Sequence, residues 1–327
     1  MTSNLPWTRR RALAAAGGLA GLSLAGAAPA LARPITTEIP AEEGYAAVPG
    51  GKVFWRRFGS GPGRPLLLLH GGPGAAHNYL LSMTALGDER PVIVYDQLGC
   101  GRSDAPTDET LYTVQRSVDE LEAVRESLGL GQVDLFGHSW GSALAIEYIC
   151  QGRGRGVEKL VLGGALASVP QCSAGMQRLL AAMPDGLAGS LHALEDAGRT
   201  GTPEYAALAQ KFYDKHLLRV PPTPDALATF ESLATSIAYR VMNGPSEFNI
   251  IGVIRDWDRR ADLAAITQQT LITTGEFDEI TLDCHETIRD GVAGPAHLVV
   301  MTGCSHLTMV EQPGLYNALI RDFLRAA

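Results

Sequence analysis

The chain of 327 residues carries a formal net charge of −8, and 46% of its residues are hydrophobic. A chain of this length and hydrophobicity can bury one large core or two modest ones. The acidic balance argues against nucleic acid or an anionic membrane as a partner, because both attract basic patches and the basic residues after the first dozen positions are scattered.

Residues 1–32 resemble an export signal. An arginine run at 9–11 precedes a stretch rich in Gly, Ala and Leu at 12–28, and an Ala-x-Ala cleavage pattern ends at Ala32. The arginine pair is similar to that of a twin-arginine signal. We therefore expect export to the periplasm or the extracellular space, with no membrane attachment after cleavage. The alternative is an uncleaved membrane anchor. A segment so rich in Ala and Gly is only marginally apolar enough to span a bilayer.

Strand and helix patterns alternate in the next part of the chain. Unbroken apolar runs predict buried strands, and the apolar spacing of 114–128 predicts a helix. The predicted strands are 52–58, 65–69, 91–95, 132–136 and 159–162. This alternation predicts an α/β fold, with a mostly parallel sheet and helices on both of its faces.

Between residues 165 and 260 the pattern changes, because helical stretches recur there without a strong strand. The predicted helices are 174–183, 203–218, 224–242 and 246–254. Strand patterns return at 270–274 and 297–301, and a last helix is expected near 314–324. We therefore predict a core made of residues 33–164 and 261–327, with a helical cap at 165–260 inserted into it.

A candidate nucleophile lies in the sequence Gly-His-Ser-Trp-Gly at 137–141, between the predicted strand 132–136 and a predicted helix at 142–150. A Gly-x-Ser-x-Gly turn in this context is typical of a nucleophile elbow, which exposes the serine hydroxyl. Serine needs an adjacent base, itself oriented by a carboxylate. In an α/β-hydrolase fold these follow in the order acid, then histidine. Asp278 and His306 fit, because each follows a predicted strand, and Ser139 precedes both.

Other residues compete for the acid and base roles. Glu276, Glu279 and Asp283 lie close to Asp278 in the sequence and are alternative orienting acids. His70 is the alternative base, but it precedes a glycine loop instead of following the last predicted strand.

The loop His-Gly-Gly-Pro-Gly at 70–74 follows the predicted strand 65–69. Glycines there let the backbone approach a substrate and direct an N–H group at a developing oxyanion. The residue after the nucleophile commonly supplies the second donor. We therefore predict an oxyanion hole made by the backbone N–H groups of Gly72 and Trp140.

No motif predicts a cofactor or a metal site. The five cysteines show no C-x-x-C spacing, and their odd number argues against a disulfide framework. The glycine-rich stretch at 152–156 precedes a strand, which does not fit a phosphate-binding loop. We expect no cofactor and no metal.

Three motifs carry a resemblance to a known family. They are the glycine loop at 70–74, Asp-Gln-Leu-Gly-Cys-Gly-Arg-Ser at 96–103 and the elbow at 137–142. With segments at 213–219, 242–248, 256–258 and 304–309, they resemble the proline iminopeptidase family of α/β-hydrolases, and most nearly its tricorn-interacting aminopeptidase branch. The resemblance covers about residues 45–325, and it implies that the insertion is a helical cap over the active site.

The resemblance implies a serine aminopeptidase that releases N-terminal residues from short peptides or amino-acid amides through an acyl-enzyme. It also implies two glutamates that bind the free α-ammonium of the substrate, Glu247 in the cap and Glu279 beside Asp278. Opposed carboxylates suit a buried ammonium, because charge-assisted hydrogen bonds supply both affinity and registry. From the sequence alone, the alternative for Glu247 is a solvated residue of the cap.

Three positions depart from the family pattern. His138 stands where proline-specific members usually have glycine, Ser142 where the tricorn-associated branch tends to glycine, and Leu98 where arginine is frequent. We therefore assume no preference for proline. Two alternatives remain at this point, an amino-acid amide or ester hydrolase without peptidase activity and a non-catalytic binding protein. A complete set of catalytic residues argues against the second, and a serine nucleophile excludes an epoxide hydrolase or dehalogenase.

Overall fold

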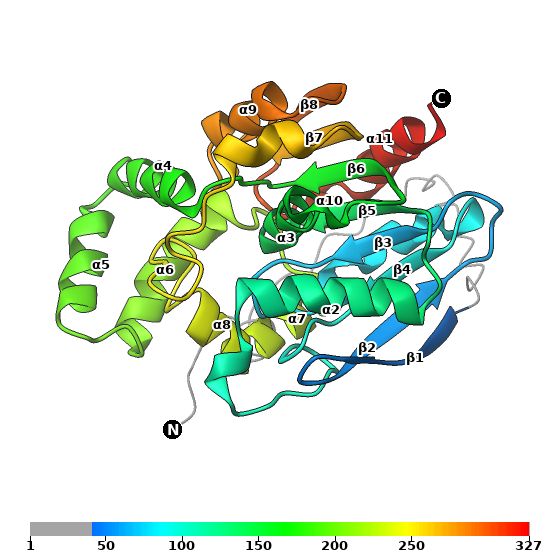
Figure 1. Cartoon of the computed structure of the whole chain (residues 1–327). Helices are drawn as coiled ribbons and strands as arrows, with labels where there is room; N and C mark the ends of the chain where they lie inside the picture. Colours follow the sequence, from blue (N-terminus) through cyan, green and yellow to red (C-terminus); the bar gives the residue numbers. More distant parts are fainter. Residues whose placement is uncertain (1–40, 327) are drawn as a thin grey trace, which may run out of the picture.

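A computed structural model describes residues 41–326, so the predicted export signal at 1–32 lies outside the described residues. Within this range, eight strands form one sheet in the order β1-β2-β4-β3-β5-β6-β7-β8 (Figure 1). The strands are β1 (Ala41–Val48), β2 (Gly51–Phe58), β3 (Leu66–Leu69), β4 (Val92–Tyr95), β5 (Val133–His138), β6 (Val157–Gly163), β7 (Gln269–Gly275) and β8 (Ala296–Met301). The pairs β1–β2 and β2–β4 are antiparallel and the other pairs are parallel, which confirms the predicted mostly parallel sheet.

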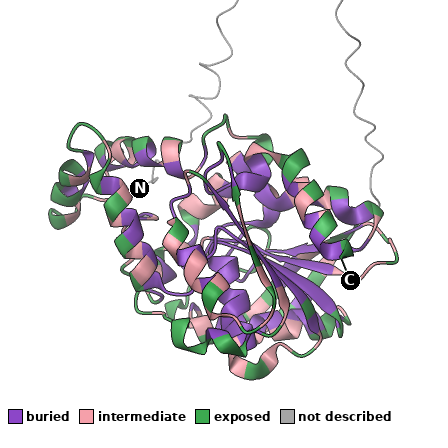
Figure 2. Ribbon diagram, turned by 90° about the horizontal axis from the view of Figure 1, so that it is seen from above, coloured by how far each residue is buried: buried purple, intermediate pink, exposed green. Residues whose placement is uncertain are grey.

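Helices cover both faces of the sheet, as predicted. Leu67 and Leu69 of β3 lie in a core with α2 (Val114–Ser127), α3 (Trp140–Tyr148) and α9 (Leu282–Gly291). Leu66 and Leu68 lie in a second core, with the 3-10 helix η1 (His77–Asp88), α10 (Thr308–Glu311) and α11 (Pro313–Arg325). Successive residues of a strand point to opposite faces, so an unbroken leucine run suits a strand that is covered on both sides. Figure 2 shows the buried sheet between helices whose outer faces are exposed.

An insertion of helices separates β6 from β7, and α4, α5 and α6 project to the left of the sheet in Figure 1. The helices described in it are α4 (Val169–Ala181), α5 (Leu187–Asp196), α6 (Pro203–His216), α7 (Pro224–Thr235) and α8 (Ile237–Met242). The two ends of the insertion pair with each other, because Val169 N–H donates to Trp257 O (2.9 Å) and Arg259 N–H donates to Ala167 O (2.8 Å). These two hydrogen bonds lie close to positions 165 and 260, which are the predicted ends of the insertion. We call residues 165–260 the cap.

The predicted helix at 224–242 is two helices in the structure. The chain breaks at Ser236, whose backbone is extended and whose side chain accepts a hydrogen bond from Tyr239 N–H at 3.2 Å. A serine in this role is a common first residue before a helix, because it satisfies an N–H group that has no partner within the helix. Helices α5 and α9 and strand β1 were not predicted.

The predicted helix at 246–254 was wrong. Residues 246–249 instead form a turn closed by a β-bridge between Ser246 and Asn249. Gly244 precedes the turn with φ of 137°, a conformation that L-residues with a side chain rarely adopt. A Cβ at Gly244 would lie 2.8 Å from Asn249 O. The chain therefore folds back on itself here, and this turn carries Glu247.

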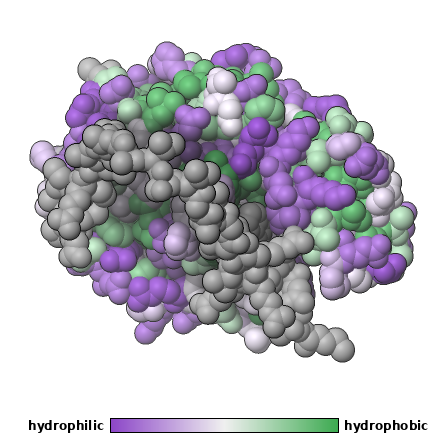
Figure 3. Space-filling model, turned by 180° about the vertical axis from the view of Figure 1, so that it is seen from behind, coloured by the Kyte–Doolittle hydropathy of each residue, from purple (hydrophilic) through white to green (hydrophobic). Residues whose placement is uncertain are grey.

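Within residues 41–326, no helix is long and apolar enough to cross a bilayer. All five cysteines are free thiols. On the face shown in Figure 3, hydrophilic and hydrophobic side chains are interspersed over the part of the surface that grey atoms leave visible.

Candidate active site

Ser139 lies at the sharp turn from β5 into α3, with φ of 55° and ψ of −125°. This backbone conformation is costly for a residue with a side chain, and it persists only where surrounding contacts enforce it. A Cβ at Gly137 would lie 2.3 Å from Gly141 O, and a Cβ at Gly141 would lie 2.1 Å from Leu69 O. Both glycines of the Gly-x-Ser-x-Gly motif are therefore required by close backbone contacts that hold the serine in place.

One pocket brings Ser139 together with His306, Glu247 and Glu279. The rest of its wall consists of Gly71, Gly72, Ala75, Tyr79 and His138 from the core, the cap residues Leu217, Thr229, Phe230 and Leu233, and Leu307. The pocket thus lies between the core and the cap, and its cap side is largely apolar.

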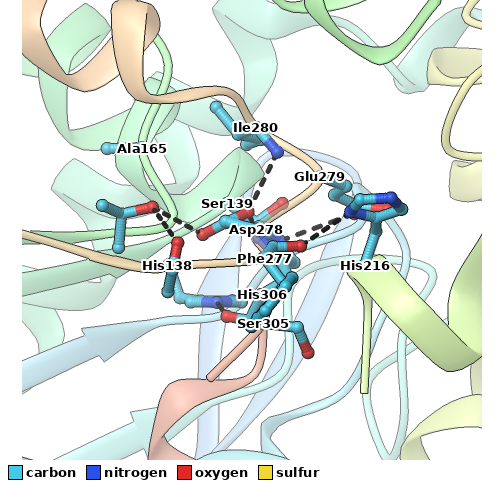
Figure 4. A network of polar contacts seen from close by, with 12 residues as sticks. His138, Ser139, Ala165, His216, Phe277, Asp278, Glu279, Ile280, Ser305 and His306 are labelled. Atoms are coloured by element: carbon cyan, nitrogen blue, oxygen red, sulfur yellow. Dashed lines mark hydrogen bonds and ion pairs between the residues drawn. The ribbon is translucent and has the colours of Figure 1, made fainter. Parts of the chain in front are cut away.

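Asp278 and His306 form a buried pair at the ends of β7 and β8 (Figure 4). His306 Nδ1 lies 2.7 Å from Asp278 Oδ1, which also accepts from Ile280 N–H at 2.9 Å. The Thr274 hydroxyl donates to Asp278 Oδ2 at 3.1 Å. Burial raises the pKa of Asp278, but the charge of His306 and these hydrogen bonds lower it to about 2. An ionised Asp278 holds the His306 proton on Nδ1, which leaves Nε2 for chemistry in the pocket.

Two of the alternative acids, Glu276 and Asp283, and the alternative base are engaged elsewhere, whereas Glu279 lies on the Nε2 side of His306. Glu276 accepts a hydrogen bond from Gly303 N–H at 2.9 Å, and Asp283 forms an ion pair with Arg178 at 3.0 Å on the surface. His70 is fully buried, and its Nε2 accepts from the backbone N–H of Gln97 at 2.9 Å. Of the candidates from the sequence, Asp278 is the carboxylate that contacts His306 Nδ1.

His306 Nε2 forms no hydrogen bond with Ser139 Oγ in the described part of the chain, and it lies 3.8 Å from Glu279 Oε1. Burial lowers the pKa of His306, but the nearby carboxylates of Asp278, Glu279 and Glu247 outweigh it and raise the pKa to about 9. Hydrogen bonds between nucleophile and base are often longer in a substrate-free enzyme than in its complexes.

The predicted oxyanion donors are unengaged. No hydrogen bond of residues 41–326 uses the backbone N–H of Gly72 or of Trp140. Trp140 is the first residue of α3, so its N–H lies at the positive end of the helix dipole. Gly72 has φ of 109°, and a Cβ there would lie 2.4 Å from Gly74 N. Only glycine fits at position 72, and it also lines the pocket.

In the sequence His138 is only a departure from the family pattern, but in the structure both of its ring nitrogens are hydrogen-bonded. Gly71 N–H donates to the Tyr79 hydroxyl at 2.8 Å, and that hydroxyl lies 2.9 Å from His138 Nδ1. His138 Nε2 lies 3.0 Å from His306 O. A carbonyl only accepts, so Nε2 carries the proton and Tyr79 donates to Nδ1. Burial and the charge of His306 lower the pKa of His138 to about 3, so the ring is neutral.

The motif at 96–103 supports these loops. Gln97 Nε2 donates to His70 O, and Gln97 Oε1 accepts from the Trp140 indole, both at 2.9 Å. Asp96 is fully buried and accepts from Arg102 N–H at 2.9 Å. The motif therefore connects the glycine loop to the elbow. The residue types of the motif did not predict this role.

The cap contributes to the backbone around His306. His306 N–H donates to His216 O at 3.2 Å, and Leu307 N–H donates to Leu217 O at 3.1 Å. Because His216 and Leu217 lie at the end of α6, the loop that carries His306 is held from the cap as well as from the core.

Glu247 from the cap and Glu279 from the core both line the pocket. Glu247 Oε1 accepts from the Tyr239 hydroxyl at 2.8 Å, whereas Glu279 Oε2 is buried and has no hydrogen-bond partner among the described residues. Burial raises the pKa of both carboxyl groups, and the charge of Glu247 raises the pKa of Glu279 further. A buried carboxylate oxygen without a partner is costly, so this site favours a proton or a cation.

Comparisons with known proteins agree with this geometry. Residues 66–319 match the family model described as the alpha/beta hydrolase family. The chain is 38% identical over 290 residues to a proline iminopeptidase of Saccharolobus solfataricus, covering 88% of this chain and 93% of that protein. It is 38% identical over 287 residues to a proline iminopeptidase of Thermoplasma volcanium, covering 86% and 96%.

Solved structures give the same result. The crystal structure of VinJ matches with a TM-score of 0.83 and 35% identity, covering 86% of this chain and 98% of that chain. The crystal structure of a proline iminopeptidase of Mycobacterium smegmatis matches with a TM-score of 0.79 and 32% identity, covering 86% and 97%. The elbow, the His306–Asp278 pair and these similarities together show that the chain belongs to the proline iminopeptidase family of α/β-hydrolases.

Proposed function

We propose that this protein is a serine aminopeptidase that releases the N-terminal residue of short peptides or amino-acid amides. One observation carries the proposal: a single pocket is lined by Ser139, by His306, which Asp278 orients, and by two buried glutamates, one of which has an oxygen without a partner among the described residues. The family membership of the chain supports it.

In the proposed mechanism, Ser139 Oγ attacks the carbonyl carbon next to the free amine, and its proton passes to His306 Nε2. The backbone N–H groups of Gly72 and Trp140 stabilise the oxyanion of the tetrahedral intermediate. His306 then donates the proton to the leaving nitrogen, which breaks the C–N bond and leaves an ester on Ser139. Water hydrolyses this ester by the same route, while Asp278 keeps His306 oriented throughout.

The glutamate pair accounts for the choice of a free N-terminus. An α-ammonium placed between Glu247 and Glu279 donates charge-assisted hydrogen bonds to both and supplies the partner that Glu279 Oε2 lacks. An N-acylated substrate lacks that charge, and it would leave buried carboxylates unpaired. We therefore expect strong discrimination between free and N-acetylated substrates.

Hydrolysis of amino-acid amides or esters, without peptidase activity, is the second candidate. The cap residues Leu217, Phe230 and Leu233 give the pocket an apolar wall near Ser139 and the two glutamates. Such a wall limits how far a leaving group extends, which suits one amino-acid residue with a small leaving group.

A panel of aminoacyl anilides, dipeptides and amino-acid amides tests the proposal. The panel includes proline, alanine, leucine and phenylalanine, each free and N-acetylated, with Ser139→Ala as the control. Cleavage of the free substrates alone, lost in the control, supports an amine-dependent serine hydrolase, and turnover of dipeptides favours a peptidase over an amidase. Equal cleavage of acetylated substrates would contradict the amine-binding roles of Glu247 and Glu279.

We also propose that residues 1–32 direct export by the twin-arginine route. The support is the sequence alone, since this segment lies outside the described residues. Replacing Arg9 and Arg10 together by lysine should retain the protein in the cytoplasm, which cell fractionation measures. A protein that is exported equally well after this change uses another route.

A further inference from the structure

We infer that Glu279 keeps the catalytic base blocked in the empty enzyme, and that the α-ammonium of a substrate opens it by displacing a proton from the Glu279–His306 pair. The inference rests on the proposed function and deepens it, because it concerns the same pocket. Its first support is geometric. His306 Nε2 lies 3.8 Å from Glu279 Oε1, and no hydrogen bond within residues 41–326 joins it to Ser139 Oγ.

The second support is the charge balance around the pair. The groups that act on His306 or Glu279 are Asp278 after β7, His285 on α9, His138 at the elbow, Glu247 after α8, Tyr213 on α6, Tyr239 on α8 and Cys172 on α4. Burial lowers the pKa of His138 and of His285, so both rings are neutral near pH 7. Three acidic groups, Asp278, Glu247 and Glu279, therefore face one imidazole that can carry a positive charge.

This imbalance makes the pair retain a proton. Burial raises the pKa of Glu279, and the surrounding carboxylates raise the pKa of His306 to about 9 despite its burial. The proton on His306 forms an imidazolium, whose Nε2 faces the Glu279 carboxylate at 3.8 Å. An imidazolium has no lone pair on Nε2, so it cannot accept the proton of the Ser139 hydroxyl.

A substrate ammonium replaces the retained proton. As the cation binds Glu247 and Glu279, it supplies the positive charge that the pocket lacks and releases one proton to solvent. In the overall reaction, the protonated enzyme binds the ammonium form of the substrate, and the products are the enzyme–substrate complex and one proton. Nε2 then carries a free lone pair beside Ser139. The free amine is therefore needed twice, once for binding and once to generate the base, so that an amine-free ester loses kcat as well as affinity.

Proton release on binding is the direct test. L-Alaninamide is titrated into the Ser139→Ala variant by calorimetry at pH 6.5, in two buffers with different ionisation enthalpies. At this pH the ligand is an ammonium ion, because an α-amino group titrates near about 8. We expect the release of about one proton for each ligand bound. The change Ser139→Ala leaves the His306–Glu279 pair intact, since no hydrogen bond of the described residues joins Ser139 Oγ to it.

Two matched variants locate the proton. Adding Glu279→Gln to Ser139→Ala should reduce the release more than adding Glu247→Gln, because Glu279 lies 3.8 Å from His306 Nε2 and raises its pKa more than Glu247 does. Binding without proton release would overturn the inference and leave the aminopeptidase proposal standing. Absence of binding, with no hydrolysis of L-alaninamide by the unmodified enzyme, would overturn both.

A measurement on the unmodified enzyme avoids any dependence on the folding of variants. Methylammonium and 4-nitrophenyl acetate together supply the two halves of an aminoacyl ester. At pH 6.5, methylammonium chloride should raise kcat for the acetate ester several-fold over the same concentration of sodium chloride. No acceleration, or simple inhibition, would contradict the inference.

Discussion

The two halves of the pocket differ in how completely their polar groups are satisfied. In the half around Asp278 and His138, Asp278 accepts three hydrogen bonds and both nitrogens of His138 are engaged. In the half that Glu247 and Glu279 form, Glu279 Oε2 has no partner among the described residues. The satisfied half has its orienting hydrogen bonds in place before a substrate arrives, and it suits acyl transfer in general. The unsatisfied half is completed only by a ligand, and it therefore selects the substrate.

The largest effect is expected when the nucleophile of the satisfied half is removed. Ser139→Ala should lower kcat by about 10⁴-fold or more for free-amine substrates and for acetate esters alike, because both need the nucleophile. Steady-state kinetics on alanine 4-nitroanilide and 4-nitrophenyl acetate measure both losses. A variant that retains activity on one substrate would show that this substrate reacts elsewhere.

A change in the unsatisfied half should separate the two substrates. Glu247→Ala removes one of the two carboxylates proposed to bind the ammonium, and kcat/KM for free-amine substrates should fall by about 10²-fold. The rate on acetate esters should not fall, because these carry no ammonium and because the loss of the Glu247 charge can only lower the raised pKa of His306. The ratio of the two rates is the measurement, and equal losses on both substrates would argue against the amine-binding role.

The pH dependence sharpens the comparison. The pKa of His306 is raised to about 9, so at lower pH the base is protonated in the empty enzyme. The rate of hydrolysis of an amine-free ester should therefore rise about tenfold per pH unit up to that pKa and then level off. A pH profile of kcat/KM for 4-nitrophenyl acetate shows this, and a plateau that begins near the ordinary pKa of histidine would contradict it.

The smallest expected effect concerns a positioning residue of the satisfied half. His138→Phe leaves the Tyr79 hydroxyl and the carbonyl of His306 without their partner, and kcat should fall about tenfold, with KM little changed. Tyr79→Phe, the matched variant, should reproduce part of the loss. A rise in KM at unchanged kcat would instead place His138 in substrate binding.

Much of the core was predictable because local pattern and tertiary environment agree there. The unbroken leucine run of β3 is buried on both faces. The Gly-x-Ser-x-Gly spacing is also required by the fold, because a Cβ at Gly137 or at Gly141 would lie less than 2.5 Å from a backbone oxygen. The cap was less predictable. Its turn at 246–249 has helical spacing in the sequence, but Gly244 and the bridge between Ser246 and Asn249 fold the chain back.

The sequence by itself determined the fold class, the elbow and the order of Ser139, Asp278 and His306, because each depends on residues close to a strand end. Only the tertiary structure decided which carboxylate contacts His306, that Tyr79 and His138 join the glycine loop to the loop of His306, and that Glu279 Oε2 is left without a partner. The physical reason is distance along the chain. Hydrogen bonds and unpaired charges in this pocket involve segments from β3 to the loop after β8, and their energies depend on burial that only the folded chain creates.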